Sequence, residues 1–204
     1  SRALNQAVWF EAKRQIPFPI NECHFDYRRV AEIFEDSSTK LKIALIAGTR
    51  RLISEHLAPF QALSIRVDSI YLSQDVIGRM LGGLPDFESK RHYCLVNVER
   101  NRSEIAYYLG TELEFSHVIS LGSHFLANRR DDTVFEYFTE TLANELQNSL
   151  DFYAGQYANR IASQVYIYGD LSYSDELISR LSTRFEFSFL RFPMETLRNF
   201  DCDN

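Results

Sequence analysis

Histidine, cysteine and paired acidic side chains are the residues of this chain that could carry out catalytic or metal-binding chemistry. No two histidines stand four residues apart, as they do in a helical zinc motif, and no two cysteines have C-x-x-C spacing. The sequence therefore predicts no metal site. The residues concerned are His24, His56, His92, His117 and His124, together with Cys23, Cys94 and Cys202.

Two smaller arrangements are further candidates for catalytic groups. His24 and Asp26 are two residues apart on an alternating segment, so they share one strand face and could form an acid/base pair. A solvated strand face is the favoured interpretation, because such pairs are common on surfaces. Cys94 lies in the middle of a hydrophobic segment, where we expect an inert buried thiol.

Nucleotide-binding and nucleophile motifs are absent from the sequence. It contains no G-x-S-x-G, no G-x-x-x-x-G-K-[ST] and no G-x-G-x-x-G. The 204 residues include only 8 glycines but 16 phenylalanines and 11 tyrosines. A chain with few glycines has few places where its backbone can closely approach a phosphate.

The charge and hydropathy pattern excludes two classes of partner. The net charge of −6 disfavours a sequence-independent hold on nucleic acid, so we expect no nucleic-acid partner. The longest apolar run, 43–47, is far shorter than a membrane span, so no direct membrane insertion is expected. The scattered cysteines and the lack of a secretory leader favour the cytoplasm, and the start at Ser1 suggests a missing N-terminal part.

The first part of the chain predicts a helix, a hairpin and a second helix. Residues 3–15 have helical spacing, and two prolines follow. Residues 22–47 are predicted to form a hairpin with a turn at 35–40, and a helix is expected after Gly48-Thr49, with Pro59 ending or perturbing it.

A strand over 64–68 and another helix should then lead to the sequence Gly82-Gly83-Leu84-Pro85. This turn is the best candidate for a boundary between two parts of the chain. The sequence therefore predicts two domains, residues 1–85 and 86–204.

The second part predicts a three-stranded meander followed by alternating helices and strands. The strands are expected at 93–98, 104–109 and 114–120, joined by short turns. After them, apolar residues from Phe135 to Leu150 recur every three or four positions and indicate a long helix. A strand at 165–168, a helix at 174–183 and a strand at 185–190 complete an α/β chain. Tyr107, Tyr108 and Tyr173 are interpreted as exposed aromatics that could mark an interface.

Residues 10–27, with the sequence FEAKRQIPFPINECHFDY, resemble the PilM family of type IV pilus assembly proteins. That family has a helix, an Ile-Pro-Phe-Pro-Leu-like stop, an acidic spacer and a strand with Asp-Tyr, and the later elements follow in family order. The resemblance implies an actin/FtsA-like, ribonuclease H-like fold of two lobes with mixed sheets, truncated at its N-terminus. The cytoplasmic domain of the GspL-type secretion protein is a related alternative.

The family's nucleotide loops are altered in this chain. An Asp-Ile-Gly phosphate loop is matched by Asn97, Val98 and Glu99, which removes a carboxylate and places another where bare backbone should meet phosphate. A Gly-rich adenosine loop is matched by Gly169, Asp170 and Leu171, so only its first glycine remains. The resemblance thus implies vestigial loops, no bound cofactor and no catalytic residues.

Three functional hypotheses follow from the resemblance and its exceptions. The first is a non-catalytic PilM-like scaffold, held peripherally at the inner membrane through partners. It would dock the cytoplasmic tail of a PilN-like inner-membrane protein, and self-association is possible. The second is an actin-like ATPase whose nucleotide site is completed by the missing N-terminal segment. The third is an α/β interaction domain unrelated to pili.

Overall fold

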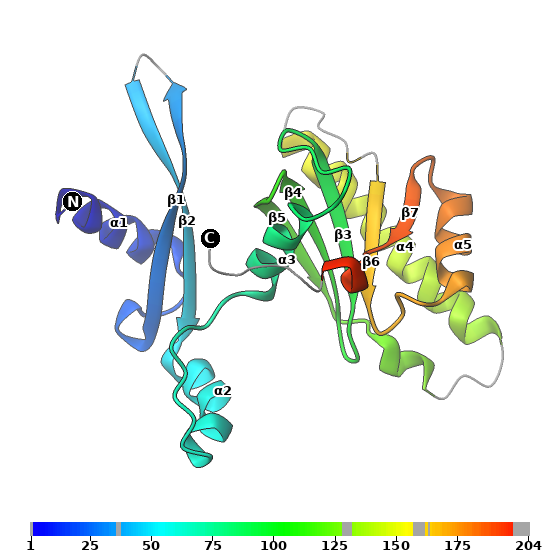
Figure 1. The fold of residues 1–204 in the computed structure, drawn as a ribbon, viewed down its shortest axis with the longest axis horizontal. Coiled ribbons are helices and arrows are strands. Elements are labelled where there is room, and N and C mark those ends of the chain that lie inside the picture. The colour runs from blue at the N-terminus through cyan, green and yellow to red at the C-terminus, as the bar shows by residue number, and fades with distance from the viewer. Residues whose placement is uncertain (1, 36–37, 128–131, 157–161, 163, 198–204) are drawn as a thin grey trace. The chain divides into compact units, whose positions relative to one another are not determined.

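The computed structural model describes residues 2–35, 38–127, 132–156, 162 and 164–197 (Figure 1). The chain divides into two compact units, Ser1–Ile70 and Tyr71–Asn204. The first unit contains α1 (Arg2–Gln15), η1 (Ile20–Glu22), β1 (Cys23–Glu35), β2 (Ser38–Thr49) and α2 (Arg50–Ala62). The second contains α3 (Ser73–Leu81), β3 (His92–Val98), β4 (Ser103–Leu109), β5 (Glu112–Ile119), η2 (Ser123–Leu126), α4 (Asp132–Gln156), β6 (Gln164–Gly169), α5 (Asp175–Arg184), β7 (Ser188–Arg191) and η3 (Met194–Leu197).

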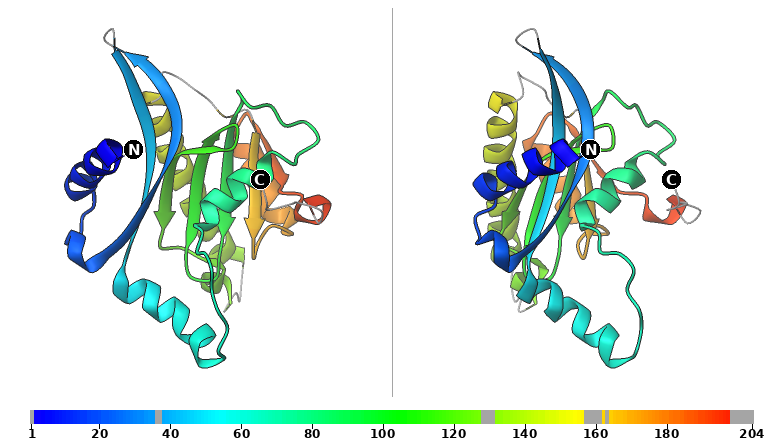
Figure 2. Two further views of the ribbon diagram at one scale, coloured as in Figure 1. Left: turned by 60° about the vertical axis from the view of Figure 1, so that its left-hand side comes forward. Right: turned by 90° about the vertical axis from the view of Figure 1, so that its left-hand side faces the viewer.

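The first unit is a long antiparallel hairpin with α1 packed against its base (Figure 2). The predicted hairpin is confirmed, and its register runs from Cys23 opposite Thr49 to Glu35 opposite Ser38. Ala12 of α1 and Ile16, the first residue after the helix, form a small core with Cys23. The Ile16 N–H still donates to the Ala12 carbonyl at 2.9 Å, so both side chains lie on the face that meets the hairpin.

The segment after α2 differs from its prediction. Pro59 neither ends nor breaks α2, which continues to Ala62. Ser64 then adopts a left-handed conformation, with φ of 55°, and residues 65–70 form no strand. The predicted strand at 64–68 is therefore wrong. Its alternating apolar residues resemble a strand, but a strand needs a neighbour for its ladder, and within the described chain this segment has none.

The second unit is built on a five-stranded mixed sheet in the order β5-β4-β3-β6-β7. β3, β4 and β5 pair antiparallel, which confirms the predicted meander. β6 is parallel to β3 and to β7, and α4 lies in the connection that crosses from the meander to β6. This mixed arrangement confirms the predicted α/β class.

Each face of this sheet has its own core (Figure 1). On one face, α4 and α5 pack against alternate residues of β3 such as Cys94 and Val96. On the other, α3 packs against Tyr93 and Leu95. The predicted apolar stripe of α4 is buried from Phe135 to Leu146, whereas Leu150 at its end is only partly buried against the same core.

Two of the three tyrosines expected at the surface are in fact buried. Tyr107 faces the core beneath α4 and stacks on Tyr153, with ring centroids 4.3 Å apart. Tyr108 faces the opposite core and donates to the Gln74 carbonyl at 3.0 Å. Adjacent strand residues point to opposite faces, and both faces of β4 are covered, so neither ring reaches solvent. Only Tyr173 is exposed as expected.

α3 lies in the second unit, although the sequence suggested a boundary after residue 85. Its buried residues Ile77 and Leu81 join the core that includes Tyr93. Gly78 lets the helix approach the sheet closely: a Cβ there would lie 2.5 Å from the Thr111 carbonyl oxygen. The boundary between the two compact units falls between Ile70 and Tyr71, before α3, because α3 buries its apolar face on this sheet.

Gly78→Ala should therefore destabilise the second unit by roughly 1–3 kcal/mol, because backbone must shift to admit the methyl group. The matched control is Gly155→Ala in α4, where no atom lies within 4 Å of an added Cβ. That control should be neutral or stabilising by up to about 1 kcal/mol. Urea unfolding of both variants measures the difference. Equal midpoints for the two would contradict the close packing of α3.

Candidate functional site

The six residues that match the family's nucleotide loops lie at the carboxyl ends of two neighbouring strands in the second unit's sheet. Asn97 and Val98 end β3, and Glu99 follows it; Gly169 ends β6, and Asp170 and Leu171 follow it. The two strands are parallel neighbours, with Val98 opposite Gly169. Ligands of open α/β sheets bind outside the carboxyl ends of such strands, where neighbouring connections diverge. We refer to these six residues as the β3–β6 corner.

The turn after β3 is closed by its own side chains. Asn97 Nδ2 donates to Glu99 Oε1 at 3.0 Å, and Arg102 Nε donates to Glu99 Oε2 at 3.0 Å. The Glu99 N–H donates to the Arg102 carbonyl at 2.9 Å. The Glu99 N–H is thus already bonded to the protein, and the Glu99 carboxylate belongs to the same turn.

The turn after β6 is bonded to the end of β3 in the same way. The Asp170 N–H donates to the Val98 carbonyl at 2.7 Å, and Ser123 Oγ donates to Asp170 Oδ2 at 2.6 Å. Gly169 has φ of 90°, and a Cβ there would lie 2.4 Å from the Val98 oxygen. This glycine therefore serves the close approach of the two turns, which is a structural requirement.

A row of polar side chains crosses the sheet next to the corner. Asn97 lies opposite Glu104 of β4 on one side and Tyr168 of β6 on the other. Gln74 Nε2 of α3 donates to Glu104 Oε1 at 2.6 Å. Burial raises the pKa of the Glu104 carboxyl and also that of the Tyr168 hydroxyl. The sequence did not indicate Glu104 or Gln74, because their proximity depends on strand register and on the docking of α3.

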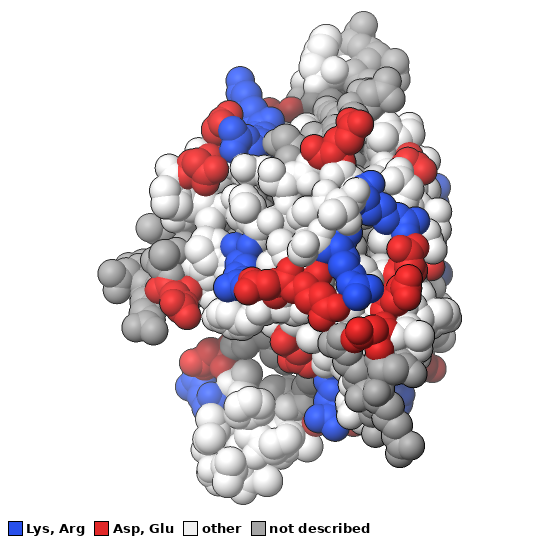
Figure 3. Space-filling model, turned by 90° about the vertical axis from the view of Figure 1, so that its right-hand side faces the viewer, with Lys and Arg blue, Asp and Glu red and all other residues white. Residues whose placement is uncertain are grey.

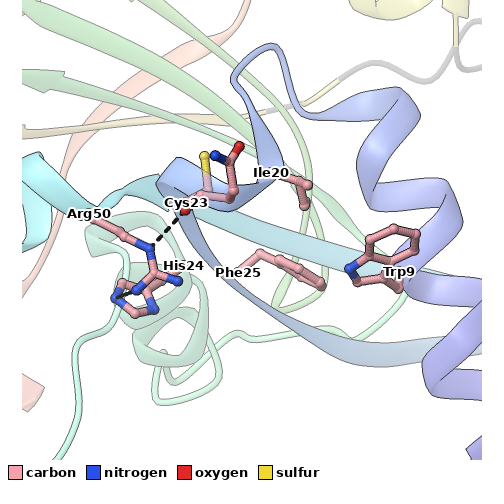
Figure 4. Close-up of a pocket in the computed structure, with 7 residues that line it drawn as sticks. Trp9, Ile20, Cys23, His24, Phe25 and Arg50 are labelled. Atoms are coloured by element: carbon pink, nitrogen blue, oxygen red, sulfur yellow. Dashed lines mark hydrogen bonds between the residues drawn. The ribbon is translucent and has the colours of Figure 1, made fainter.

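The first unit contains a separate pocket of about 460 Å³ between α1, η1, β1 and the start of α2 (Figure 4). Trp9, Ile20 and Phe25 supply apolar walls. Arg50 supplies a cation, held by hydrogen bonds from Nε to the Asn21 carbonyl at 3.1 Å and between Nη1 and His24 at 3.2 Å. Its lining residues are Trp9, Ile20, Asn21, Cys23, His24, Phe25 and Arg50.

Sequence reasoning missed this pocket. Arg50 begins α2 directly after the N-cap Thr49, whose hydroxyl accepts from the Leu52 N–H at 3.3 Å. The cap sets where the helix begins, and so where Arg50 lies relative to β1. The start of α2 at Arg50 could be predicted from Gly48-Thr49. The contacts of Arg50 with η1 and β1 could not, because those residues are distant in sequence.

The surroundings of the other candidate catalytic groups agree with the expectations from the sequence. His24 contacts Arg50, whereas Asp26 accepts a hydrogen bond from the Tyr27 N–H at 2.7 Å, and both side chains are solvated as the favoured interpretation predicted. Cys94 is fully buried, and burial raises the pKa of its thiol to about 12, as expected for an inert cysteine. Within the described residues, no three His, Cys, Asp or Glu side chains are grouped as metal ligands. Cys202 lies outside those residues.

Charged side chains of both signs alternate over the outer face of the second unit (Figure 3). Arg180 of α5 pairs with Glu176 at 3.0 Å, and Arg184 pairs with Glu140 of α4. Arg191 likewise pairs with Asp175. No helix in the described part of the chain is long and apolar enough to cross a bilayer.

The fold of the chain is that of actin-like proteins. Among solved structures, the chain is similar to an MreB5 of Spiroplasma citri bound to AMPPNP, with a TM-score of 0.52 and 9% identity over 74% of this chain. It is similar to the ethanolamine utilization protein EutJ of Carboxydothermus hydrogenoformans, with a TM-score of 0.51 and 10% identity over 74%. The actin-like class implied by the resemblance is thereby confirmed.

The similarity to one structure in this class covers almost the entire chain. The chain superposes on a structure of the PilM–PilN type IV pilus biogenesis complex over 99% of its length, with a TM-score of 0.77 and 16% identity. The resemblance to PilM is thus confirmed at the level of the fold. The chain spans 67%, 62% and 59% of the PilM–PilN, MreB5 and EutJ chains. No protein-family model and no curated protein sequence matches it.

Asn97→Asp would restore the family's carboxylate in the β3–β6 corner. It should destabilise the second unit by roughly 1–3 kcal/mol at pH 7, because Glu99 loses a hydrogen-bond donor and gains a like charge. This repulsion raises the pKa of the carboxyl pair in the folded state. The penalty is therefore present at neutral pH and shrinks as the pH falls toward about 4.

The matched control for this variant is Asn144→Asp, because Asn144 Oδ1 accepts from Arg184 Nη2 at 2.6 Å. There a new carboxylate faces a guanidinium, so stability at pH 7 should be unchanged or slightly higher. Urea unfolding at pH 7 and pH 4.5, with and without Mg²⁺, checks both variants. Recovery of the Asn97→Asp variant by Mg²⁺ would contradict a closed corner.

Proposed function

We propose that this chain is part of a PilM-like, non-catalytic scaffold that docks the short cytoplasmic tail of an inner-membrane assembly protein. The observation that carries the non-catalytic part is the β3–β6 corner. The N–H groups of Glu99 and Asp170 are bonded to protein carbonyls, and the corner also holds the carboxylate of Glu99. A triphosphate would have to displace these bonds and approach a like charge.

The docking part of the proposal is supported by the pocket in the first unit. Its apolar walls can cover one or two aliphatic side chains of an extended peptide, and Arg50 can donate to a carbonyl or carboxylate of the same peptide (Figure 4). Because the chain superposes over almost its entire length on a structure of a PilM–PilN complex, a PilN-like tail is the partner we propose. Such a partner would place the scaffold in the cytoplasm, at the inner membrane.

An actin-like ATPase completed by a further segment is the competing function, and Mg-ATP distinguishes the two. On the proposed function, millimolar Mg-ATP leaves the melting temperature of the full-length protein unchanged. Binding at a concentration tenfold above Kd would stabilise the fold by about 1.4 kcal/mol. A reproducible upward shift with Mg-ATP, absent with Mg²⁺ alone, would overturn the non-catalytic proposal.

Arg50→Glu should weaken binding of the cytoplasmic tail peptide of the PilN-like protein from the same organism at least tenfold. The variant places a carboxylate where a peptide acceptor should lie. Arg51→Glu is the matched control: it adds the same charge on the same helix, but Arg51 is outside the pocket and pairs with Glu55 at 2.6 Å. The affinity of the Arg51→Glu variant for the peptide should stay within about twofold of that of the unmodified chain.

Isothermal titration calorimetry measures both variants against the unmodified chain. Equal losses in the two variants would show that overall charge, rather than the pocket, governs binding. No heat with the unmodified full-length chain would overturn the docking proposal and favour an unrelated interaction domain.

A further inference from the structure

The outer face of α1 exposes aromatic side chains next to basic ones. Val8 and Ala12 are buried against the hairpin, whereas Trp9 and Phe10 are 41% and 66% exposed. Their rings meet edge to face, with centroids 5.2 Å apart. Two adjacent large aromatics at the surface therefore form a continuous apolar patch, which the fold of the first unit does not cover.

Each of these aromatics has a cation one helical turn further along. Lys13 is four residues after Trp9, and its Nζ lies 5.7 Å from the indole ring centre. Arg14 is four residues after Phe10 and pairs with Glu11 at 3.2 Å, with 76% of its side chain exposed. An exposed pair of this kind contributes little, so the guanidinium can exchange its partner for a phosphate at small cost.

We propose that this α1 face, consisting of Trp9, Phe10, Lys13 and Arg14, binds the surface of an anionic phospholipid bilayer. The tryptophan indole, with its apolar ring and polar N–H, prefers the headgroup region, and phenylalanine adds apolar contact. Lysine and arginine pair with lipid phosphates there. The contact is shallow and peripheral. It goes beyond the proposed function, in which the membrane is reached only through a protein partner.

The distribution of charge along the chain favours this surface. Residues 1–70 contain ten Lys and Arg against eight Asp and Glu, whereas residues 71–204 contain twelve against twenty. The acidic character of the whole chain therefore comes from its second unit. At physiological salt, charges interact over about 8 Å, so the local sign at α1 governs attraction to a lipid surface.

The α1 face should bind weakly by itself. A lysine or arginine near an anionic surface contributes about 1 kcal/mol, and a stable anchor needs a second signal. A tail from a membrane protein would provide that signal, since tethering raises the effective concentration of the membrane surface. The α1 face would then orient, relative to the bilayer, a scaffold that the tail already holds at the membrane.

The chain has one tryptophan, and it lies in the proposed contact. Trp9 emission therefore reports directly on insertion, without a label. Titrating the full chain at low salt with vesicles of phosphatidylglycerol should move this emission to shorter wavelength and carry the protein into the vesicle pellet. Vesicles of phosphatidylcholine should do neither, and brominated phosphatidylglycerol should quench the emission.

The variant Phe10→Ser/Lys13→Glu/Arg14→Glu keeps Trp9 as reporter, and it should need at least tenfold more anionic lipid for half-maximal binding. The matched control is Phe60→Ser/Arg51→Glu/Arg66→Glu. It removes an aromatic that is 46% exposed and makes the same change of net charge elsewhere in the first unit. The control should bind within about twofold of the unmodified chain. Urea unfolding of each confirms that the fold is retained.

Three outcomes would overturn the proposal. They are unchanged Trp9 emission with no sedimentation on anionic vesicles, equal binding to both lipids, and equal losses in the variant and its control. These outcomes are separate from those for tail docking, because no peptide is present. Arg50→Glu serves as a cross-check: it should lose the tail peptide and keep at least half of the vesicle binding of the unmodified chain.

Discussion

The parallel ladder between β3 and β6 is the interaction on which the second unit depends. The two strands are separated in sequence by the rest of the meander and by α4, and their pairing brings Val98 beside Gly169. The ladder also fixes which residues face each core, since Cys94 and Val165 lie under α4 while Leu95 and Tyr166 face α3. The β3–β6 corner is a direct consequence of this pairing.

Within that corner, the fold satisfies its own polar groups. Backbone donors at a strand end either remain available to a ligand or bond to the protein, and those of Glu99 and Asp170 bond to the protein. Asn97 and Arg102 hold the Glu99 carboxylate, and Ser123 holds that of Asp170. In this actin-like fold the ends of β3 and β6 are therefore closed by hydrogen bonds within the protein.

In the first unit, by contrast, large apolar side chains remain exposed to solvent in the folded structure. Its core is small, and the Trp9 ring contributes both to the pocket beside Arg50 and to the aromatic pair on α1. Large exposed aromatics cost solvation free energy unless something covers them. The two proposals assign different partners to this apolar surface: a peptide in the pocket beside Arg50 and a lipid surface against α1. Both are compatible with a scaffold close to a membrane.

Local patterns in the amino-acid sequence were enough to predict several elements of the fold. The hairpin, the meander and the α4 stripe were predictable because alternation and helical spacing are read along the chain. The PilM resemblance also named the residues after β3 and β6 as altered nucleotide loops, and that assignment stays a prediction. The segment 64–68 shows the limit of such patterns, since its alternation was real but no strand in the described residues pairs with it.

Long-range packing determines which predicted elements form and which distant residues come into contact. Tyr107 and Tyr108 are buried because both faces of β4 are covered, and α3 belongs to the second unit because it packs on Tyr93 and Leu95. Glu104 lies beside Asn97 through strand register, and Arg50 reaches Asn21 through the placement of a helix start. These contacts join residues far apart in the chain, and local periodicity carries no information about such pairs.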